Sequence, residues 1–514
     1  MNLLRIFVFP IALSLLLFSC KEDPKPDGRI PITITGFSLT SSAVPGGRLT
    51  VDGDWIHPFG EKINLVFVSE DQVNLPITIN PDFSGELPQI LLPPGNYHYY
   101  GNTDMLQISE FLPIEIEGNL QVTEASSVLL TGKTEYQLVS FSKENLKEES
   151  RITQPLESPF FSNEDYYYSY VMPDRVLKAE LIFQNGEKIN WALDAKAFFH
   201  SSYFFQAPPS QKPVPALSDP QLVLARSIVQ IDSDFIPDQM PLFGQVPLSL
   251  ELPEASGMQW ISNRLFAIND GGNGATMYEI DSYHGQEIRI IKITNAENID
   301  WEDMAVSGNY LYIGDFGNNL GNRTNLRVLR VPVQDILTKN EVQAELINFS
   351  YDRQTGTPSP GGDHRFDCEA MVYHDGQLLL FTKPTNGLGS DIYTLDPSPG
   401  TQTARFAGTM ETAGWITGAD MTPDGKNLVF IGYENKGIAS QAFLGLIENP
   451  QLPALPGNSL KTIRLGSVAL TSQTEGITIN RDFRVKIAGE QIKQGGFTVP
   501  QLLSELDLKG ILEN

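Results

Sequence analysis

The chain is poor in cysteine, histidine and basic residues. It has two cysteines and six histidines among 514 residues, and the histidines are scattered. This excludes a disulfide framework and argues against a transition-metal centre. The chain has only 36 Lys and Arg but 62 Asp and Glu, which gives a formal net charge of −26. Because such a surface repels phosphate backbones, we expect no nucleic-acid partner.

Several sequence motifs of enzymes are also missing. The chain has no Gly-x-Ser-x-Gly and no His-Glu-x-x-His. Gly132-Lys133-Thr134 has the ending of a phosphate-binding loop, but Ser127 stands where that loop has its first glycine. No common hydrolase or nucleotide-binding signature therefore identifies an activity.

Long apolar runs are absent after the first nineteen residues, so no later transmembrane segment is expected. Residues 1–19 combine a positive Arg5 with a short apolar run, which predicts a signal peptide. Their end resembles a bacterial lipobox, and the resemblance implies that Cys20 is lipidated. The acidic, Pro-rich residues 20–31 then form a tether and resemble the surface-export signal of Bacteroidetes-type lipoproteins; an ordinary solvated linker is the alternative. We expect an outer membrane lipoprotein exposed at the cell surface and attached to the membrane through the lipid on Cys20.

Short alternating apolar runs, broken by Gly and Pro turns, predict an all-β fold. The expected parts are a β-sandwich over 32–118, a second sandwich over 119–206, a linker over 207–243 and a propeller over 244–514. The start of the first sandwich, from Ile34 to Gly53, resembles an IPT/TIG-type immunoglobulin-like domain. Aromatic clusters at Tyr166–Tyr170 and Phe199–Phe205 could stack on carbohydrate or fill the sandwich core.

The segment 244–514 contains an internal repeat of five units. The repeated tripeptides are Ser256-Gly257-Met258, Glu302-Asp303-Met304, Glu369-Ala370-Met371, Ala419-Asp420-Met421 and Glu475-Gly476-Ile477. A hairpin turn follows each of them, and two further apolar runs follow each hairpin. Five units of about four strands predict a five-bladed β-propeller. Val246–Leu252 could supply the outermost strand of the last blade, and the long spacing from Met304 to Met371 leaves six blades open.

In a propeller, the first strands of the blades lie nearest the axis, so Glu302, Glu369 and Glu475 should converge. Three carboxylates about 5 Å apart repel by roughly 3 kcal/mol per pair at an effective dielectric of about 20. Either they bind protons or a cation lies among them. Ser256 and Thr417 add oxygen donors, and a set made only of oxygen favours Ca²⁺. Alternatively, the glutamates accept hydrogen bonds from backbone amides and join the inner strands.

This order of axial residues resembles that of the soluble calcium-activated nucleotidases, and the resemblance implies a central calcium. Ala419 departs from the family, which has a hydroxyl residue there, so nucleotidase activity does not follow. The run Asp300–Asp303 with Gly314–Asn319 also resembles an uncharacterised family of Bacteroidetes propeller lipoproteins.

The second strands of the hairpins should end at the same rim as the glutamates. The candidate catalytic residues there are Asp315, Asn269, Lys383 and Arg323, and further polar residues expected at the rim are Asp270, Arg365, Tyr433, Lys436 and Glu490. We expect a calcium-centred propeller that binds an unidentified extracellular ligand or protein. A calcium-dependent, nucleotidase-like hydrolase of a phosphate ester is the alternative, and a structural scaffold is the third possibility.

Overall fold

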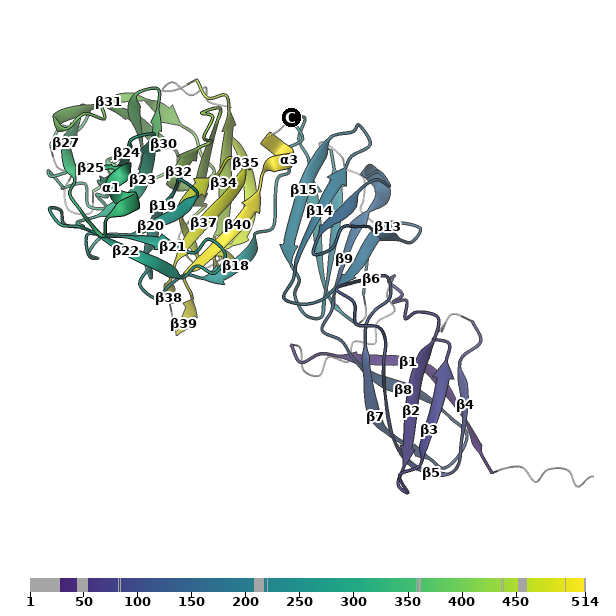
Figure 1. Cartoon of the computed structure of the whole chain (residues 1–514). Helices are drawn as coiled ribbons and strands as arrows, with labels where there is room; N and C mark the ends of the chain where they lie inside the picture. Colours follow the sequence, from purple (N-terminus) through teal and green to yellow (C-terminus); the bar gives the residue numbers. More distant parts are fainter. Residues whose placement is uncertain are drawn as a thin grey trace, which may run out of the picture. The chain divides into compact units, whose positions relative to one another are not determined.

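The structure is a computed structural model that describes residues 28–512, without 44–53, 82, 84, 208–216, 220, 357, 359–361, 436, 438, 452–459 and 495. The signal peptide, Cys20 and most of the tether lie outside the described residues. Strands dominate the described chain, and the longest of its helices, α1 (Val333–Thr338), has six residues (Figure 1). None of the described helices is long and apolar enough to cross a membrane. The prediction of an all-β fold is confirmed.

The chain divides into two compact units, of which the first contains one seven-stranded sheet. The strands are β1 (Ile30–Thr40), β2 (Ile63–Ser69), β3 (Asn74–Ile79), β4 (Gln89–Leu92), β5 (Gly95–Asn102), β7 (Glu115–Val122) and β8 (Ser126–Lys133), in the order β3-β2-β5-β7-β8-β1-β4. Along β2, β5 and β7, buried and more exposed residues alternate. The sheet therefore has one apolar face that forms the core and one polar face toward solvent.

The expected boundary between residues 118 and 119 falls inside β7. Glu115 of β7 pairs with Lys133 of β8, so the first unit continues to residue 133. Strand pairing decides this boundary, and composition does not reveal it.

The second unit begins with a β-sandwich of two sheets. One sheet contains β6 (Ile108–Ser109), β9 (Gln137–Ser142), β12 (Phe161–Ser162), β13 (Tyr166–Val171), β16 (Phe199–Gln206) and β17 (Val223–Gln230). The other contains β10 (Arg151–Gln154), β11 (Ser158–Pro159), β14 (Val176–Ile182) and β15 (Lys188–Asp194), and η1 (Lys143–Asn145) follows β9. Strand β17 lies inside the range expected to be a linker and pairs in parallel with β16. Four of its eight residues are exposed and only one is buried, so the apolar pattern that marks other strands is weak.

The remainder of the second unit contains four hydrogen-bonded sheets, and one of them has eight strands because β27 (Glu345–Tyr351) pairs in parallel with β31 (Gly400–Met410). Divided at that pair, they give five sets of four main strands, called the sheets of the ring, which are arranged around a ring (Figure 1). Their strands, from the inside outward, are β19 (Ala255–Ile261), β20 (Arg264–Asn269), β21 (Thr276–Ile280) and β22 (Glu287–Ile293); β23 (Trp301–Ser307), β24 (Tyr310–Asp315), β25 (Arg327–Pro332) and β27 (Glu345–Tyr351); β28 (Asp367–His374), β29 (Gln377–Lys383), β30 (Ser390–Leu395) and β31 (Gly400–Met410); β32 (Trp415–Met421), β33 (Asn427–Tyr433), β34 (Gln441–Glu448) and β35 (Lys461–Ser467); β36 (Gln473–Ile479), β37 (Arg484–Glu490), β40 (Leu502–Asp507) and β18 (Phe243–Pro247). Each innermost strand packs against the next, and β36 packs back against β19. This closed ring is the arrangement of a β-propeller.

The strand that precedes the first repeat unit, β18, closes the ring. β18 pairs antiparallel with β40 and so completes the sheet that holds the C-terminal strands. The sequence placed this strand at Val246–Leu252, which overlaps its true range by two residues. The smaller elements around the ring are β26 (Glu341–Val342), α2 (Val468–Thr471), β38 (Ile492–Gln494), β39 (Phe497–Val499) and α3 (Lys509–Leu512).

The second sandwich shares one apolar cluster with part of the propeller, while other buried propeller residues form separate clusters. Leu181 and Trp191 of the sandwich belong to the same buried cluster as Ile477 and Leu506 of the propeller. Polar contacts add to it: the backbone N–H of Gly244 donates to the Asp194 carboxylate at 2.9 Å. The two parts of this unit therefore stabilise each other.

Candidate functional site

All five innermost strands carry a β-bulge near their first residues. Between Ala255 and Met258 of β19, for example, two residues stand opposite one residue of β20. Corresponding register shifts occur in β23, β28, β32 and β36. The residues displaced from the pairing include all five predicted metal ligands, which are Ser256, Glu302, Glu369, Thr417 and Glu475. Bulges redirect side chains out of the regular alternation, so these residues share a special position.

The bulge also identifies the equivalent residue in the fourth sheet. The register of β32 shifts between Ile416 and Gly418, so Thr417 is the displaced residue, while Ala419 pairs regularly with Phe430. Thr417 therefore corresponds in position to Glu302 and Glu369.

The ends of the second strands surround the same rim, as expected from antiparallel pairing. Asn269 pairs with Ala255, Asp315 with Trp301, Lys383 with Asp367, Tyr433 with Trp415 and Glu490 with Gln473. Polar side chains from every sheet thus meet at one end of the ring.

The three glutamates are buried, and Glu369 adds to the effect of burial in raising the pKa of the other two. Their exposed fractions are 6% for Glu302, 3% for Glu369 and 6% for Glu475. Burial raises the pKa of Glu302 well above its ordinary value, and the nearby Glu369 raises it further. Burial is also the main cause that raises the pKa values of Glu369 and Glu475 to about 8.

Lys383 supplies one positive charge among these carboxylates. Its Nζ lies 2.5 Å from Oε1 of Glu369. Glu369 and Asp367 raise the pKa of Lys383 against the effect of burial, so the lysine stays charged. Converging carboxylates need protons or a cation, and the Lys383 ammonium supplies one positive charge from within the chain.

The two predicted hydroxyl ligands donate to backbone carbonyls. Ser256 Oγ donates to the carbonyl of Glu302, and Thr417 Oγ1 donates to that of Thr474 at 2.7 Å. Glu475 accepts from Gln473 Nε2 at 2.6 Å. The two hydroxyls therefore join neighbouring innermost strands, whereas the Glu475 contact lies within β36.

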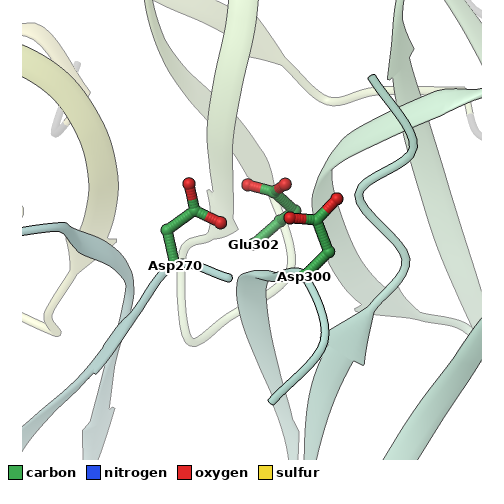
Figure 2. Close-up of side chains that lie close together, drawn as sticks. All are labelled: Asp270, Asp300 and Glu302. Atoms are coloured by element: carbon green, nitrogen blue, oxygen red, sulfur yellow. The ribbon is translucent and has the colours of Figure 1, made fainter. Parts of the chain in front are cut away.

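A different group of carboxylates comes closest together. Oxygens of Asp270, Asp300 and Glu302 lie within 4.8 Å of one another, and the side chains converge at the rim (Figure 2). Burial raises the pKa values of Asp270 and Asp300 to about 6. Arg323 Nη1 approaches Asp300 only to 3.9 Å, and within the described part of the chain no hydrogen bond or ion pair reaches the carboxylate of Glu302. The group is thus short of positive charge.

Two glycines leave room for this carboxylate group. A Cβ on Gly317 would overlap Glu302 Oε1 and lie 2.6 Å from Asp300 Oδ2. A Cβ on Gly271 would overlap Asp300 Oδ1. Neither glycine has a positive φ, so space and not backbone conformation requires them.

Three candidate catalytic residues are engaged with the protein itself. The Asp315 carboxylate accepts from Arg323 and Arg327, both at 2.8 Å. Asn269 Nδ2 donates to the Glu251 carbonyl at 2.7 Å. Of the other expected basic residues, Arg365 pairs with Asp391, and Lys436 lies outside the described residues.

The hydrogen bonds that join the inner strands go to aspartates. Asp303 accepts from the backbone N–H groups of Met304, Met371 and Ala419, which belong to three different sheets. Asp420 accepts from the backbone N–H of Ile479 at 3.0 Å and from the Thr478 hydroxyl at 2.8 Å. The role that the sequence offered to the glutamates as an alternative is therefore filled by their neighbours in the repeat.

Sequence reasoning did not select Asp270 and Asp300 as ligands. Asp270 directly follows the end of a second strand, and Asp300 lies two residues before the repeated Glu302. Their position beside the repeat is the sequence feature that could have identified them as ligands.

Comparisons with known proteins add a short repeat match. The LVIVD repeat matches residues 300–321, which span Asp300 and the β23–β24 hairpin. No curated protein matches the chain.

Solved structures with similarity to this chain include propeller-type proteins. A candidate TolB protein of Agrobacterium tumefaciens is 12% identical over 52% of this chain and 84% of its own, with a TM-score of 0.29. Hydrazine synthase of Kuenenia stuttgartiensis is 13% identical over 47% and 78%, with a TM-score of 0.25. A candidate cell adhesion protein of Bacteroides fragilis is 12% identical over 41% and 95%, with a TM-score of 0.24. The strand pairing of the chain itself defines the propeller.

Proposed function

We propose that this chain is a surface lipoprotein whose five-bladed propeller holds a calcium ion at its rim and binds an extracellular ligand there. Counting each sheet of the ring as one blade gives the five blades. The lipid on Cys20 and the IPT/TIG-like nature of the first domain belong to the same proposal and rest on the sequence motifs alone.

The observation that carries the proposal is the convergence of Asp270, Asp300 and Glu302. Ca²⁺ binds oxygen ligands at about 2.3–2.6 Å, so ligands on opposite sides of the ion lie about 5 Å apart. The 4.8 Å limit on the distances in this group fits that geometry. A buried carboxylate without a partner is costly, and a divalent cation would remove that cost.

Two sets of ligands are possible at this rim. We prefer Asp270, Asp300 and Glu302, of whose carboxylates only that of Asp270 accepts a hydrogen bond within the described chain, from the backbone N–H of Gly271. In the other set, Ser256, Thr417 and Glu475 donate or accept hydrogen bonds and Glu369 pairs with Lys383. In the alternative set of Ser256, Glu302, Glu369, Thr417 and Glu475, the ion would have to displace these contacts. Glu302 is common to both.

The test is thermal unfolding in calcium and in chelator. A ligand that binds only the folded state raises the free energy of unfolding by about 2.7 kcal/mol when its concentration is a hundredfold above Kd. We expect calcium to raise Tm by several degrees and Asp300→Asn with Glu302→Gln to abolish that rise. Glu345→Gln, at a half-exposed position on β27, should retain it. Equal Tm values of the wild type in calcium and in chelator would contradict the calcium site.

The ligand sets can be separated by a second variant. Glu475→Gln should leave the calcium response intact if Asp270, Asp300 and Glu302 hold the ion. A loss as complete as that of the double variant would favour the alternative set.

A calcium-dependent hydrolase is the less favoured function. Such an enzyme needs a free positive group for the leaving phosphate and a free group to position water. Arg323, Lys383 and Asp315 already bind one another or their neighbours. A binding role requires no such free groups, and a purely structural scaffold would not need the convergent carboxylates.

A further inference from the structure

The aromatic clusters that the sequence offered for stacking on carbohydrate are not available. Tyr166–Val171 is buried throughout, and Tyr203, Phe204 and Phe205 are each less than a tenth exposed. These rings pack on one another in the sandwich core; Phe141, for instance, stacks on Tyr203 at 5.5 Å. Stacking surfaces must be sought elsewhere.

Two rings lie side by side on the polar face of the first unit. Tyr100 is 45% exposed, and its ring centroid lies 6.1 Å from that of His98. Both residues come from β5, two positions apart, so both point to the same side of the sheet. Their cross-strand neighbours on β7 are Glu117 and Asn119.

Amides and carboxylates surround these rings. Asn96 Nδ2 donates to Glu70 at 2.6 Å, His98 Nδ1 lies 3.4 Å from Asn119 Oδ1, and the His98 and Glu117 side chains approach to 3.5 Å. Gln121 pairs across from Asn96 and extends the row. These contacts hold the side chains in place while leaving further donor and acceptor capacity toward solvent.

A shallow groove of about 710 Å³ runs along this face. It is lined by Glu70, Asn96, His98, Asn119 and Gln121 with five uncharged residues, and Tyr100 lies two positions from His98 on the same strand. None of these lining residues is lysine or arginine. A groove of this composition can hydrogen-bond to hydroxyl groups but offers no positive charge to a phosphate, sulfate or carboxylate.

We propose that this face binds a neutral glycan, with Tyr100 and His98 as the stacking platform. A sugar ring presents C–H groups to an aromatic face and hydroxyls at its edge, which both donate and accept. The amides of Asn96, Asn119 and Gln121 match those hydroxyls, while Glu70 and Glu117 disfavour anionic polymers. The site is distinct from the calcium rim and does not depend on the proposed function.

Affinity electrophoresis tests the proposal with the whole protein in native gels. The gels contain galactomannan, xyloglucan, laminarin, dextran or polygalacturonate, each with calcium and, in a parallel gel, with chelator. We expect at least one of the four neutral polymers to slow migration, polygalacturonate to have no effect, and chelator to make no difference. No slowing by any neutral polymer, or slowing by polygalacturonate alone, would overturn the proposal.

Variants connect binding to this face. Tyr100→Ala should weaken binding at least tenfold with an unchanged Tm, and Tyr100→Trp should preserve it because a larger ring offers the same platform. Tyr283→Ala, at a ring that is 72% exposed on the propeller, is the matched control and should bind as the wild type does. Unchanged binding by Tyr100→Ala would place the glycan elsewhere and refute the assignment.

Discussion

Gly317 determines how closely the backbone approaches the carboxylates at the rim. It follows β24 directly after Phe316, and its missing side chain leaves space that the oxygens of Glu302 and Asp300 occupy. Gly271 does the same on the other side of Asp300. The carboxylate group therefore depends on two residues that contribute no ligand atom themselves.

This dependence predicts the effect of Gly317→Ala. The added methyl group would overlap Glu302 Oε1, and overpacking of this kind costs about 1–3 kcal/mol. We expect a lower free energy of unfolding and a weaker calcium response, both measured by denaturation with and without calcium. The control is Gly308→Ala in the adjacent hairpin, where nothing lies within 4 Å of the new Cβ. If both variants behaved like the wild type, the rim would be looser than these contacts indicate.

The sequence predicted individual site residues through the repeat. Glu302, Glu369 and Glu475 recur at one position of the unit, so their convergence follows from the repeat alone. Asp270 lies in the loop after β20 and Asp300 in the loop before β23, so the two flank different units of the repeat. Their approach to Glu302 depends on loop geometry and on two glycines, which spacing along the chain does not encode.

At the scale of elements, the bulge in each innermost strand gives neighbouring residues different roles. In β23, Glu302 and Asp303 both lie in the bulge, but Glu302 joins the rim carboxylates while Asp303 receives backbone amides from β28 and β32. Asp303 is fully buried, and burial raises its pKa well above the ordinary value. It thereby joins three sheets that make no ladder hydrogen bonds to one another at the ring centre.

Asp303→Ala should therefore be strongly destabilising. It would leave three backbone N–H groups without an acceptor, and each buried unpaired donor costs about 1–3 kcal/mol. We expect a loss of at least about 3 kcal/mol in urea denaturation. Glu287→Ala, at an exposed position of the outer strand β22, should change stability by less than about 0.5 kcal/mol. A loss no larger than that of the control would mean that the aspartate does not hold the inner strands.

Element boundaries followed from the sequence only where apolar alternation was strong. The hairpins of the repeat were found because a turn and an apolar strand recur after each tripeptide. Strand β17 was missed because half of its residues are exposed, which weakens the apolar pattern. The true end of the first sheet at β8 was missed because strand pairing, and not composition, sets it.

At the scale of the whole molecule, the two units have different cores. The first unit has its own apolar interior, which includes Ile63, Leu65 and Phe67, whereas the second sandwich and the propeller share one cluster of buried side chains. Parts that share a core unfold together, while a unit with its own core can unfold independently. The calcium site proposed above lies in the propeller and should stabilise everything that unfolds with it.

Differential scanning calorimetry should therefore record two unfolding transitions, and calcium should raise the midpoint temperature of only one of them. Leu181→Ala removes a fully buried side chain from the second sandwich, and such truncations cost about 2–5 kcal/mol. Leu181 lies in the cluster shared with the propeller. We therefore expect this variant to lower the midpoint temperature of the calcium-sensitive transition, although Leu181 belongs to the sandwich and the calcium site to the propeller. Leu65→Ala, equally buried in the first unit, should lower only the other transition. A third transition that responds to Leu181→Ala but not to calcium would show that sandwich and propeller unfold separately despite their common core.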